Sequence, residues 1–259
     1  MGDLVHFSFA LSSRMRAFIA LRDGLSCLEQ ARSDRHGAAW LHAACDLRTS
    51  LLGEQGRKNA LPEIITIFAD LQEYLQKLSE DAPLYRDTIA RACQEIDRQM
   101  SRLQGGVPEV CDYLEQDALI HAYLNTQKKH DWLGHKWCMP QSITALWRDP
   151  DARILPLHQR LVPLDNAIAK LNEMLSDFVG WNKRTATAGS DHIVLERGKS
   201  YGLMVIALQE EIVAQGIIPD ISSNRLAIRL RFQQWQAGEP SRECEENIPY
   251  AMMLVPIGG

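Results

Sequence analysis

The chain has 259 residues, of which 46% are hydrophobic, so it can bury the core of one large domain or of two smaller ones. Its formal net charge of -5 argues against nucleic-acid binding over a whole basic surface, although a local basic patch is compatible with that total. The six cysteines are scattered without a CxxC pair, and no secretory signal or apolar run of roughly 20 residues is visible. We therefore expect a cytoplasmic protein with free thiols and without membrane insertion.

The N-terminus is predicted to form a short strand followed by a helix. Val5, Phe7 and Phe9 recur at every second position, which indicates a strand, and Ser12 or Ser13 suits the cap of the helix that follows. The apolar residues of this helix share one face at helical spacing: Phe18, Leu21, Leu25 and Leu28. Because further strands are expected near the C-terminus, we expect one sheet that is closed by both ends of the chain.

The next predicted elements are helices that pack on one another. Residues 40–51 form a helix that Gly53 ends. Residues 62–104 fit a helical hairpin, because their apolar residues step by four and three along a packing seam. We expect the pair Gly105-Gly106 to stop the second helix of this hairpin.

The helical part is predicted to end with a long packing helix. A helix over residues 108–125 leads into an irregular, basic and aromatic loop over residues 128–140. A short helix follows and is expected to end at Asp149-Pro150. The last helix covers residues 164–178, where apolar residues again step by four and three.

The amino-acid composition changes after residue 182, where Thr, Val, Ile and Gly become frequent, and this composition favours strands. The predicted strands cover residues 183–187, 192–195, 203–208, 226–232 and 250–255. The expected fold class is α+β: a mainly α-helical bundle domain with a small antiparallel β-domain formed by the C-terminal strands and the N-terminal strand. We place the α-helical domain at residues 11–181 and the β-rich domain at residues 1–10 plus 182–259.

One predicted strand carries a row of arginines. Its even-numbered residues are apolar: Leu226, Ile228, Leu230 and Phe232. The residues between them include two arginines: Ala227, Arg229 and Arg231. A period of two places the apolar set on the core face of a sheet and the arginines on the other face. Two interpretations are open: a solvated face, or a docking surface for an acidic partner.

Basic residues gather at three places in the sequence: Arg14, Arg16 and Arg22; Lys128 and Lys129; Arg225, Arg229 and Arg231. If both chain ends share one sheet, the first and last groups come together on its surface. Arginine forks bind carboxylates in pairs of hydrogen bonds, so such a patch would suit an acidic peptide. The alternative is a set of independent surface charges that pair with local Asp and Glu.

No arrangement typical of catalysis stands out. The sequence lacks GxSxG, GxGxxG and HExxH motifs, so we expect neither enzymatic activity nor a cofactor. His130, His135 and Cys138 could contribute metal ligands, but their spacing matches no established zinc pattern. The alternative function is a nucleic-acid- or metal-supported binding module that uses the basic aromatic loop 128–138.

Several motifs carry a resemblance to a known family. The N-terminal helix begins Leu11-Ser-Ser-Arg-Met-Arg-Ala-Phe18. The C-terminal strand pair contains Ile218-Pro-Asp-Ile-Ser222 and, after a short turn, Arg225-Leu-Ala-Ile-Arg229. Between them the matching segments follow in order: Val110–Leu124, Met139-Pro140, Ala145–Trp147, Leu161–Leu175 and Trp181–Thr185. Together these motifs resemble the ZapD family of bacterial cell-division proteins over most of the chain.

The resemblance implies both an architecture and a function. It implies an α-helical domain with a small β-domain, a homodimer and no enzymatic activity. It further implies binding to the C-terminal tail of FtsZ and bundling of FtsZ protofilaments during Z-ring assembly, in the cytoplasm at the mid-cell division ring. We expect no nucleic-acid partner.

The resemblance also suggests which residues bind the tail. Four arginines fall on basic positions of the family: Arg14, Arg16, Arg225 and Arg229. Ala20 and Ala118 stand where relatives commonly have arginine, and Ile143 replaces a family histidine. Arg22 or the pair Lys128-Lys129 could substitute for the missing charges. The predicted FtsZ-tail site is therefore the full basic patch: Arg14, Arg16, Arg22, Lys128, Lys129, Arg225, Arg229 and Arg231.

Overall fold

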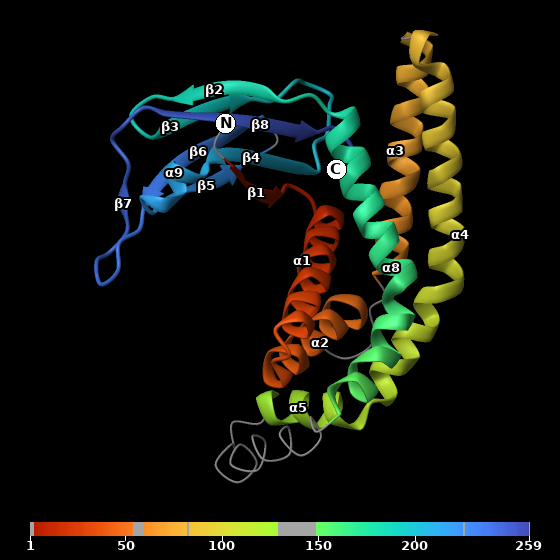
Figure 1. Ribbon diagram of the computed structural model, residues 1–259. Helices are drawn as coiled ribbons and strands as arrows, with labels where there is room; N and C mark the ends of the chain where they lie inside the picture. The colour runs from red at the N-terminus through yellow and green to blue at the C-terminus, as the bar shows by residue number, and fades with distance from the viewer. Residues whose placement is uncertain (1–2, 54–59, 82, 129–148, 225, 259) are drawn as a thin grey trace. The chain divides into compact units, whose positions relative to one another are not determined.

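The computed structural model describes residues 3–53, 60–81, 83–128, 149–224 and 226–258. The chain forms two compact units (Figure 1). Unit 1 comprises Met1–Arg16 and Met174–Gly259, and unit 2 comprises Ala17–Glu173. Unit 1 contains the strands and unit 2 contains most of the helices, so the expected α+β class is confirmed.

Unit 1 is built on two antiparallel sheets. Sheet A has the strand order β1-β4-β8-β2, and sheet B has the order β3-β6-β5 with β7 paired to β6. The strand bounds are β1 (Leu4–Ala10), β2 (Asn182–Ala186), β3 (Ser190–Val194), β4 (Leu203–Gln209), β5 (Ile217–Ser223), β6 (Ala227–Gln234), β7 (Arg242–Glu243) and β8 (Ile248–Val255). The prediction that both ends of the chain join one sheet is confirmed by sheet A, which contains β1 and β8, but the strands of unit 1 form two sheets and not one. The N-terminal strand pairs with β4 in sheet A, whereas the arginine-bearing strand β6 lies in sheet B.

One apolar core lies between the two sheets. It is formed by β4 and β8 of sheet A and by β3 and β6 of sheet B, with these buried residues among its members: Ile206, Met252, Ile193, Ile228, Leu230 and Phe232. Two sheets arise because each has an apolar face that must be covered, and the other sheet covers it. The predicted alternation along β6 is confirmed for Ile228, Leu230 and Phe232, each 0% exposed.

Leu226 departs from that alternation. It was expected on the core face, but it is 66% exposed and precedes β6. The Asn224 side chain is the cause, since its Oδ1 atom accepts hydrogen bonds from the backbone N–H groups of Leu226 (2.8 Å) and Ala227 (3.0 Å). This local turn keeps Leu226 out of the regular strand.

The first helix, α1 (Ser13–Ser33), begins as predicted. Ser12 is its cap, because its Oγ atom accepts a hydrogen bond from the Met15 N–H at 3.2 Å. The predicted apolar stripe of α1 is buried: Phe18, Leu21, Leu25 and Leu28.

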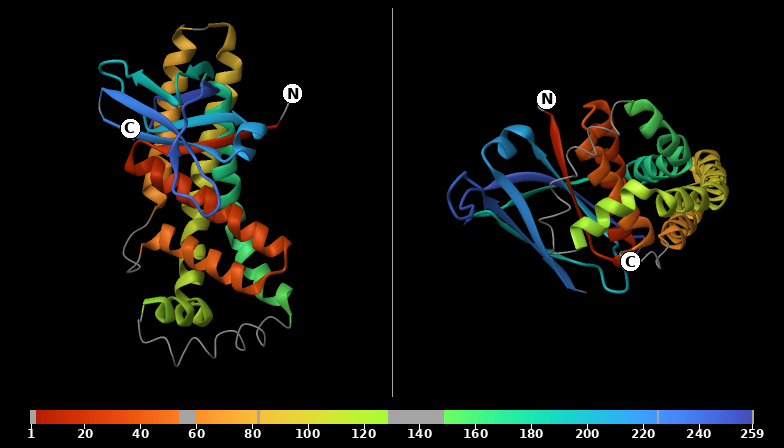
Figure 2. Two further views of the ribbon diagram at one scale, coloured as in Figure 1. Left: turned by 90° about the vertical axis from the view of Figure 1, so that its left-hand side faces the viewer. Right: turned by 90° about the horizontal axis from the view of Figure 1, so that it is seen from below.

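Unit 2 contains the predicted helical hairpin. The helix α2 (Gly37–Leu52) ends at Gly53, which has a positive φ of 69°. The helices α3 (Leu61–Asp81) and α4 (Arg86–Gln116) form the hairpin, with the short helix η1 (Pro83–Tyr85) at its tip. They lie side by side along their length (Figures 1 and 2).

The predicted break at Gly105-Gly106 is wrong, because α4 continues through these glycines and through Pro108 to Gln116. Glycine costs a helix only about 1 kcal/mol, which packing can offset. At Gly106 packing requires the glycine, since a Cβ atom there would lie 2.8 Å from Cγ of Pro163. The actual break is at Asp117, whose Oδ1 accepts from the first N–H groups of α5 (Ala118–Lys128).

The final long helix, α8 (Pro150–Phe178), is longer than predicted. Asp149-Pro150 was expected to end a helix, but instead it opens this one. The Ala152 N–H donates to Asp149 Oδ1 at 3.2 Å, and proline is well suited to the first helical position. The short helix predicted before it lies outside the described residues. A further short helix, α9 (Glu210–Ala214), follows β4 and was not predicted.

Among the described helices, none combines the length and the apolar content that crossing a bilayer requires.

Candidate functional site

The arginines of β6 lie on the outer face of sheet B, opposite the core. The antiparallel register places Arg229 between His192 of β3 and Ser222 of β5. It places Arg231 between Ser190 of β3 and Asp220 of β5. Directly opposed residues on one face of a sheet lie close enough to interact, so the two arginines have different electrostatic surroundings.

Arg231 is already neutralised by acidic groups. Its Nη1 atom donates a hydrogen bond to Oε1 of Glu243 at 2.8 Å, and Asp220 stands opposite it across the β5–β6 pair. An acidic ligand would have to displace Glu243 and would be repelled by the nearby Asp220. This arginine therefore fits the alternative interpretation of a locally paired surface charge.

Arg229 differs from Arg231, because its side chain is exposed and no ion pair or hydrogen bond from it is present within the described part of the chain. It lines a groove of about 750 Å³ on the outer face of sheet B. The other walls contribute hydroxyl, amide and imidazole groups: Thr187, Ser190, His192, Ser222, Ser223 and Asn224. A guanidinium fork with hydroxyl donors around it is well suited to hold a carboxylate.

The one acidic residue among those that line the groove, Asp191, is hydrogen-bonded to other residues and does not neutralise Arg229. It accepts hydrogen bonds from Arg184 Nε at 2.7 Å and from the Tyr250 hydroxyl at 2.7 Å. The hydrogen bond from Arg184 holds the pKa of Asp191 below its usual value, and burial raises the pKa of Tyr250. Asp191 thus joins the two sheets and leaves the charge of Arg229 uncompensated.

The free edges of sheet B are poorly suited to pairing with an added strand. The Phe232 N–H donates to the Gly189 carbonyl (2.8 Å), and the Phe232 carbonyl accepts from the Cys244 N–H (2.9 Å), so both groups point away from β5. Pro219, which is opposite Phe232 on β5, therefore directs its backbone nitrogen away from β6, to the free edge of the sheet. Proline has no N–H to offer there. At the β3 edge, the His192 N–H already donates to Asp191 at 2.7 Å. A peptide would therefore be held by side chains over the face of the sheet.

The N-terminal arginines are not brought to this groove. Arg14 and Arg16 lie in the first turn of α1, within unit 1, on either side of the buried Met15. Residues two apart on a helix do not share a face, so they do not form one pair. Neither lines the groove around Arg229. The reason is topological, since α1 follows a strand of sheet A.

The remaining predicted site residues have other positions. Arg22 belongs to unit 2, where it pairs with Asp23 at 2.9 Å and lies over the Phe18 ring at 5.9 Å. Lys128 is the last residue of α5. Ala20 and Ala118, where the family commonly has arginine, are both exposed. The other predicted positions lie outside the described residues: Lys129, Arg225, Ile143, His130, His135 and Cys138.

The described residues contain no group of three His, Cys, Asp or Glu side chains that could hold a metal ion. Burial raises the pKa of the Cys45 thiol to about 12, which makes it a poor nucleophile and a poor ligand. The metal alternative therefore depends on residues outside the described part of the chain.

The sequence did not reveal the partners of Arg229 and Arg231. His192 and Ser222 flank Arg229, and Glu243 neutralises Arg231, through pairing between strands that are distant in sequence. The only available signal was the predicted strand at residues 192–195, and its register against β6 could not be derived from pattern alone.

Comparison with known proteins points to one group, proteins of cell division. The relatives all carry the name "Cell division protein ZapD". One from Cupriavidus metallidurans is 22% identical over 257 residues, which is 97% of this chain and 99% of the relative. One from Nitrosomonas eutropha is 25% identical over 254 residues, covering 96% of this chain and 98% of the relative.

A third relative, from Ralstonia pickettii, is 33% identical over 103 residues, or 40% of each chain. No family model matches the chain. The resemblance to ZapD proteins is thus confirmed over nearly the whole length of the chain, at low identity.

Proposed function

We propose that this chain is a non-enzymatic cell-division factor that binds the C-terminal tail of FtsZ and cross-links FtsZ protofilaments during Z-ring assembly. It acts in the cytoplasm, at the mid-cell division ring. Two observations support the proposal: the full-length similarity to proteins named "Cell division protein ZapD", and the groove around Arg229. The groove carries the larger weight, because it combines an uncompensated guanidinium with hydroxyl donors on a surface suited to carboxylates.

The members of the predicted basic patch contribute unequally in this proposal. Arg229 is the anchor for an acidic side chain of the tail. Arg16 is also exposed, on α1, and adds long-range attraction. Arg231 contributes less, because Glu243 and Asp220 already offset its charge.

Cross-linking follows from symmetry. We propose that the chain is a homodimer, so each assembly carries two copies of the tail site. Each copy captures a tail from a different protofilament. Weak single contacts then become firm links, because the second contact forms at a high effective concentration.

Co-sedimentation with FtsZ, with and without its C-terminal tail, tests the proposal. Wild-type protein should bundle intact filaments and leave tailless filaments in the supernatant. The double variant Arg16→Glu, Arg229→Glu should lose bundling while its circular dichroism spectrum stays unchanged.

Arg242→Glu is the matched control, because Arg242 is an exposed arginine of the same unit that already pairs with Glu239 at 2.6 Å. This control should bundle like wild type. Normal bundling of tailless filaments, or by the folded double variant, would contradict the proposal.

A further inference from the structure

Two apolar side chains are exposed beside the groove around Arg229. Val194 is 74% exposed and Leu226 is 66% exposed, the two highest values among the large apolar residues described in unit 1. They are neighbours across the sheet, because Val194 is the last residue of β3 and the N–H of the next residue, Leu195, donates to the Leu226 carbonyl at 2.8 Å. Single exposed apolar residues are common on proteins, whereas two together beside a groove indicate a contact surface.

The strand register connects this apolar pair to the groove. It places Val194 opposite Ala227, and Ala227 itself lines the groove. Val194 and His192 stand on either side of the buried Ile193, so both lie on the outer face of sheet B. Two residues of a strand span about 7 Å, so Val194 lies about 7 Å along β3 from the position where His192 opposes Arg229.

A specific turn holds Leu226 away from the core. The alternation along β6 would place it on the core face, but the Asn224 side chain accepts hydrogen bonds from the N–H groups of Leu226 (2.8 Å) and Ala227 (3.0 Å). Keeping a leucine in water forgoes the stabilisation that burial would provide. Its exposure is explained if a ligand covers the side chain when it binds.

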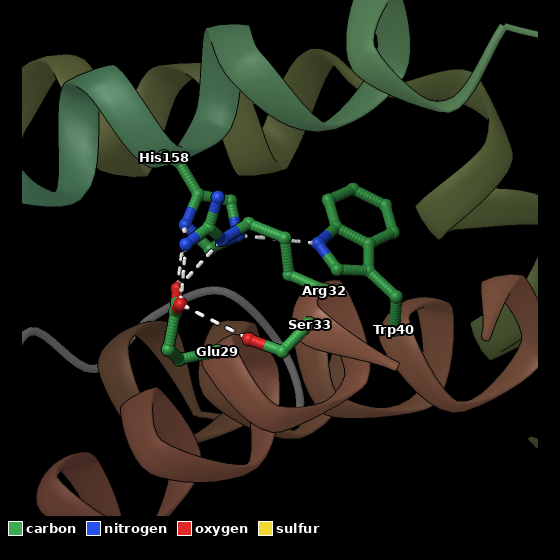
Figure 3. A network of polar contacts seen from close by, with 5 residues as sticks. All are labelled: Glu29, Arg32, Ser33, Trp40 and His158. Atoms are coloured by element: carbon green, nitrogen blue, oxygen red, sulfur yellow. Dashed lines mark hydrogen bonds and ion pairs between the residues drawn. The ribbon is translucent and has the colours of Figure 1, made fainter. Parts of the chain in front are cut away.

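The groove between α1 and α8 in unit 2 does not offer an acidic ligand the same opportunity (Figure 3). Nε of Arg32 donates to Glu29 at 2.7 Å, and Nδ1 of His158 lies 3.7 Å from the same carboxylate. Burial lowers the pKa of His158, so its imidazole is neutral near pH 7. The other arginine of this groove, Arg22, forms an ion pair with the next residue. Charge complementarity therefore favours the groove around Arg229 for an acidic partner.

We propose that the outer face of sheet B recognises two features of the FtsZ tail together: a carboxylate at Arg229 and an apolar side chain over Val194 and Leu226. This inference rests on the proposed function, because it assigns a second contact to the same tail. An extended peptide advances by about 3.3 Å per residue and directs alternate side chains to the same side, so residues two positions apart match the spacing of about 7 Å. The site thus selects tails in which an acidic residue stands two positions from an apolar one.

Fluorescence anisotropy of a labelled peptide with the sequence of the FtsZ C-terminal tail tests the apolar contact. The double variant Val194→Thr, Leu226→Gln replaces both apolar ends by uncharged polar groups, so the Kd for the peptide should rise by about tenfold or more. Leu4→Gln is the matched control, because Leu4 is another exposed leucine of unit 1 but lies on β1 of sheet A. The control should bind like wild type, and both proteins should keep the wild-type circular dichroism spectrum.

Salt separates the apolar contact from the charged one. Arg229→Gln should weaken peptide binding and also reduce its dependence on salt, because it removes a charged contact. The Val194→Thr, Leu226→Gln variant should bind more weakly at every salt concentration, with the salt dependence of wild type. Affinity equal to that of wild type in this double variant, or a salt dependence reduced as in Arg229→Gln, would overturn the apolar contact.

Alanine substitutions along the tail peptide test the spacing. An acidic residue and an apolar residue two positions apart should each be needed for full affinity. Replacing that apolar residue by alanine should weaken binding to the wild-type chain by about tenfold, but should change binding to the Val194→Thr, Leu226→Gln variant by less than about twofold, because its contact is already lost there. Equal effects on the two proteins, or a required apolar residue at another spacing, would refute the proposed arrangement.

These outcomes are distinguishable from failure of the proposed function. A tail peptide that depends on Arg229 but binds equally well without Val194 and Leu226 would overturn only the apolar contact. A wild-type chain that binds no tail peptide would overturn the proposed function, and this inference with it.

Discussion

Asp191 offers a quantitative test of how the two sheets of unit 1 hold together. Its side chain is 14% exposed and accepts hydrogen bonds from three groups: Arg184, the Tyr250 hydroxyl and the His192 N–H. Arg184 and Tyr250 belong to sheet A, whereas Asp191 belongs to β3 of sheet B. Asp191→Ala therefore removes the polar link between the sheets.

The expected cost comes mainly from the buried partner. Tyr250 is 5% exposed, so its hydroxyl would be left without an acceptor, at a cost of about 1–3 kcal/mol. The Arg184 side chain is 37% exposed and can be hydrated instead, so loss of its ion pair with Asp191 adds at most about 1 kcal/mol. The free energy of unfolding should thus fall by about 1–4 kcal/mol.

A double variant tests the reasoning more sharply. Tyr250→Phe alone should cost about 1 kcal/mol, because Asp191 keeps its hydrogen bonds from Arg184 and His192. In Asp191→Ala, Tyr250→Phe no hydroxyl remains unsatisfied, so the double variant should be more stable than Asp191→Ala alone. Urea unfolding followed by circular dichroism measures the free energy of unfolding of the two single variants and of the double variant. The dependence of that free energy on urea concentration should be compared among them. The reasoning would be refuted if the double variant lost as much unfolding free energy as the two single variants together. It would also be refuted if Asp191→Ala lowered the free energy of unfolding by less than about 1 kcal/mol.

Three further predictions concern the backbone, pH and salt. Gly216→Ala should destabilise unit 1 by several kcal/mol, because the φ of Gly216 is +80° and the added Cβ would lie 2.1 Å from the Trp235 carbonyl oxygen. Gly198→Ala is the control, because the space around an added Cβ is open there. It should lower the free energy of unfolding in urea by only about 1 kcal/mol. Because the folded-state pKa of His158 is lowered from 6.5, the unfolded chain binds more protons at acidic pH, so stability should fall as the pH drops below about 6.5. His158→Gln should remove that part of the pH dependence, as measured by urea unfolding at pH 7.5 and pH 5.5. Bundling of FtsZ should weaken as salt screens the charged contacts, and equal bundling at low and high salt would refute an electrostatic tail site.

Local patterns predicted the elements of this fold well. The alternation along β6 and the cap at Ser12 each depend on near neighbours in the sequence, and both are confirmed. The errors arose where distant contacts override local preference. Gly106 lies inside a helix because it packs against Pro163, which no local rule could supply.

The candidate site was less predictable than the fold. The sequence places Arg229 and Arg231 on one face of a strand, and the structure agrees. It could not tell which of them is neutralised, because strand pairing brings Glu243 to Arg231 and places Asp220 opposite it. The convergence of the N-terminal and C-terminal arginines was inferred from a single closed sheet, and two sheets formed instead.

A single uncompensated arginine sets a limit on how the chain can work. One charge-assisted hydrogen-bonded pair contributes about 1.5–3 kcal/mol, whereas micromolar binding needs about 8 kcal/mol. A tail held mainly by Arg229 would therefore be released easily from one copy. In a homodimer the second site acts at an effective concentration in the millimolar range, and a filament presents many tails close together. Selectivity for assembled filaments over free FtsZ would then follow from the weakness of each contact, because only polymers offer enough tails to hold both sites at once.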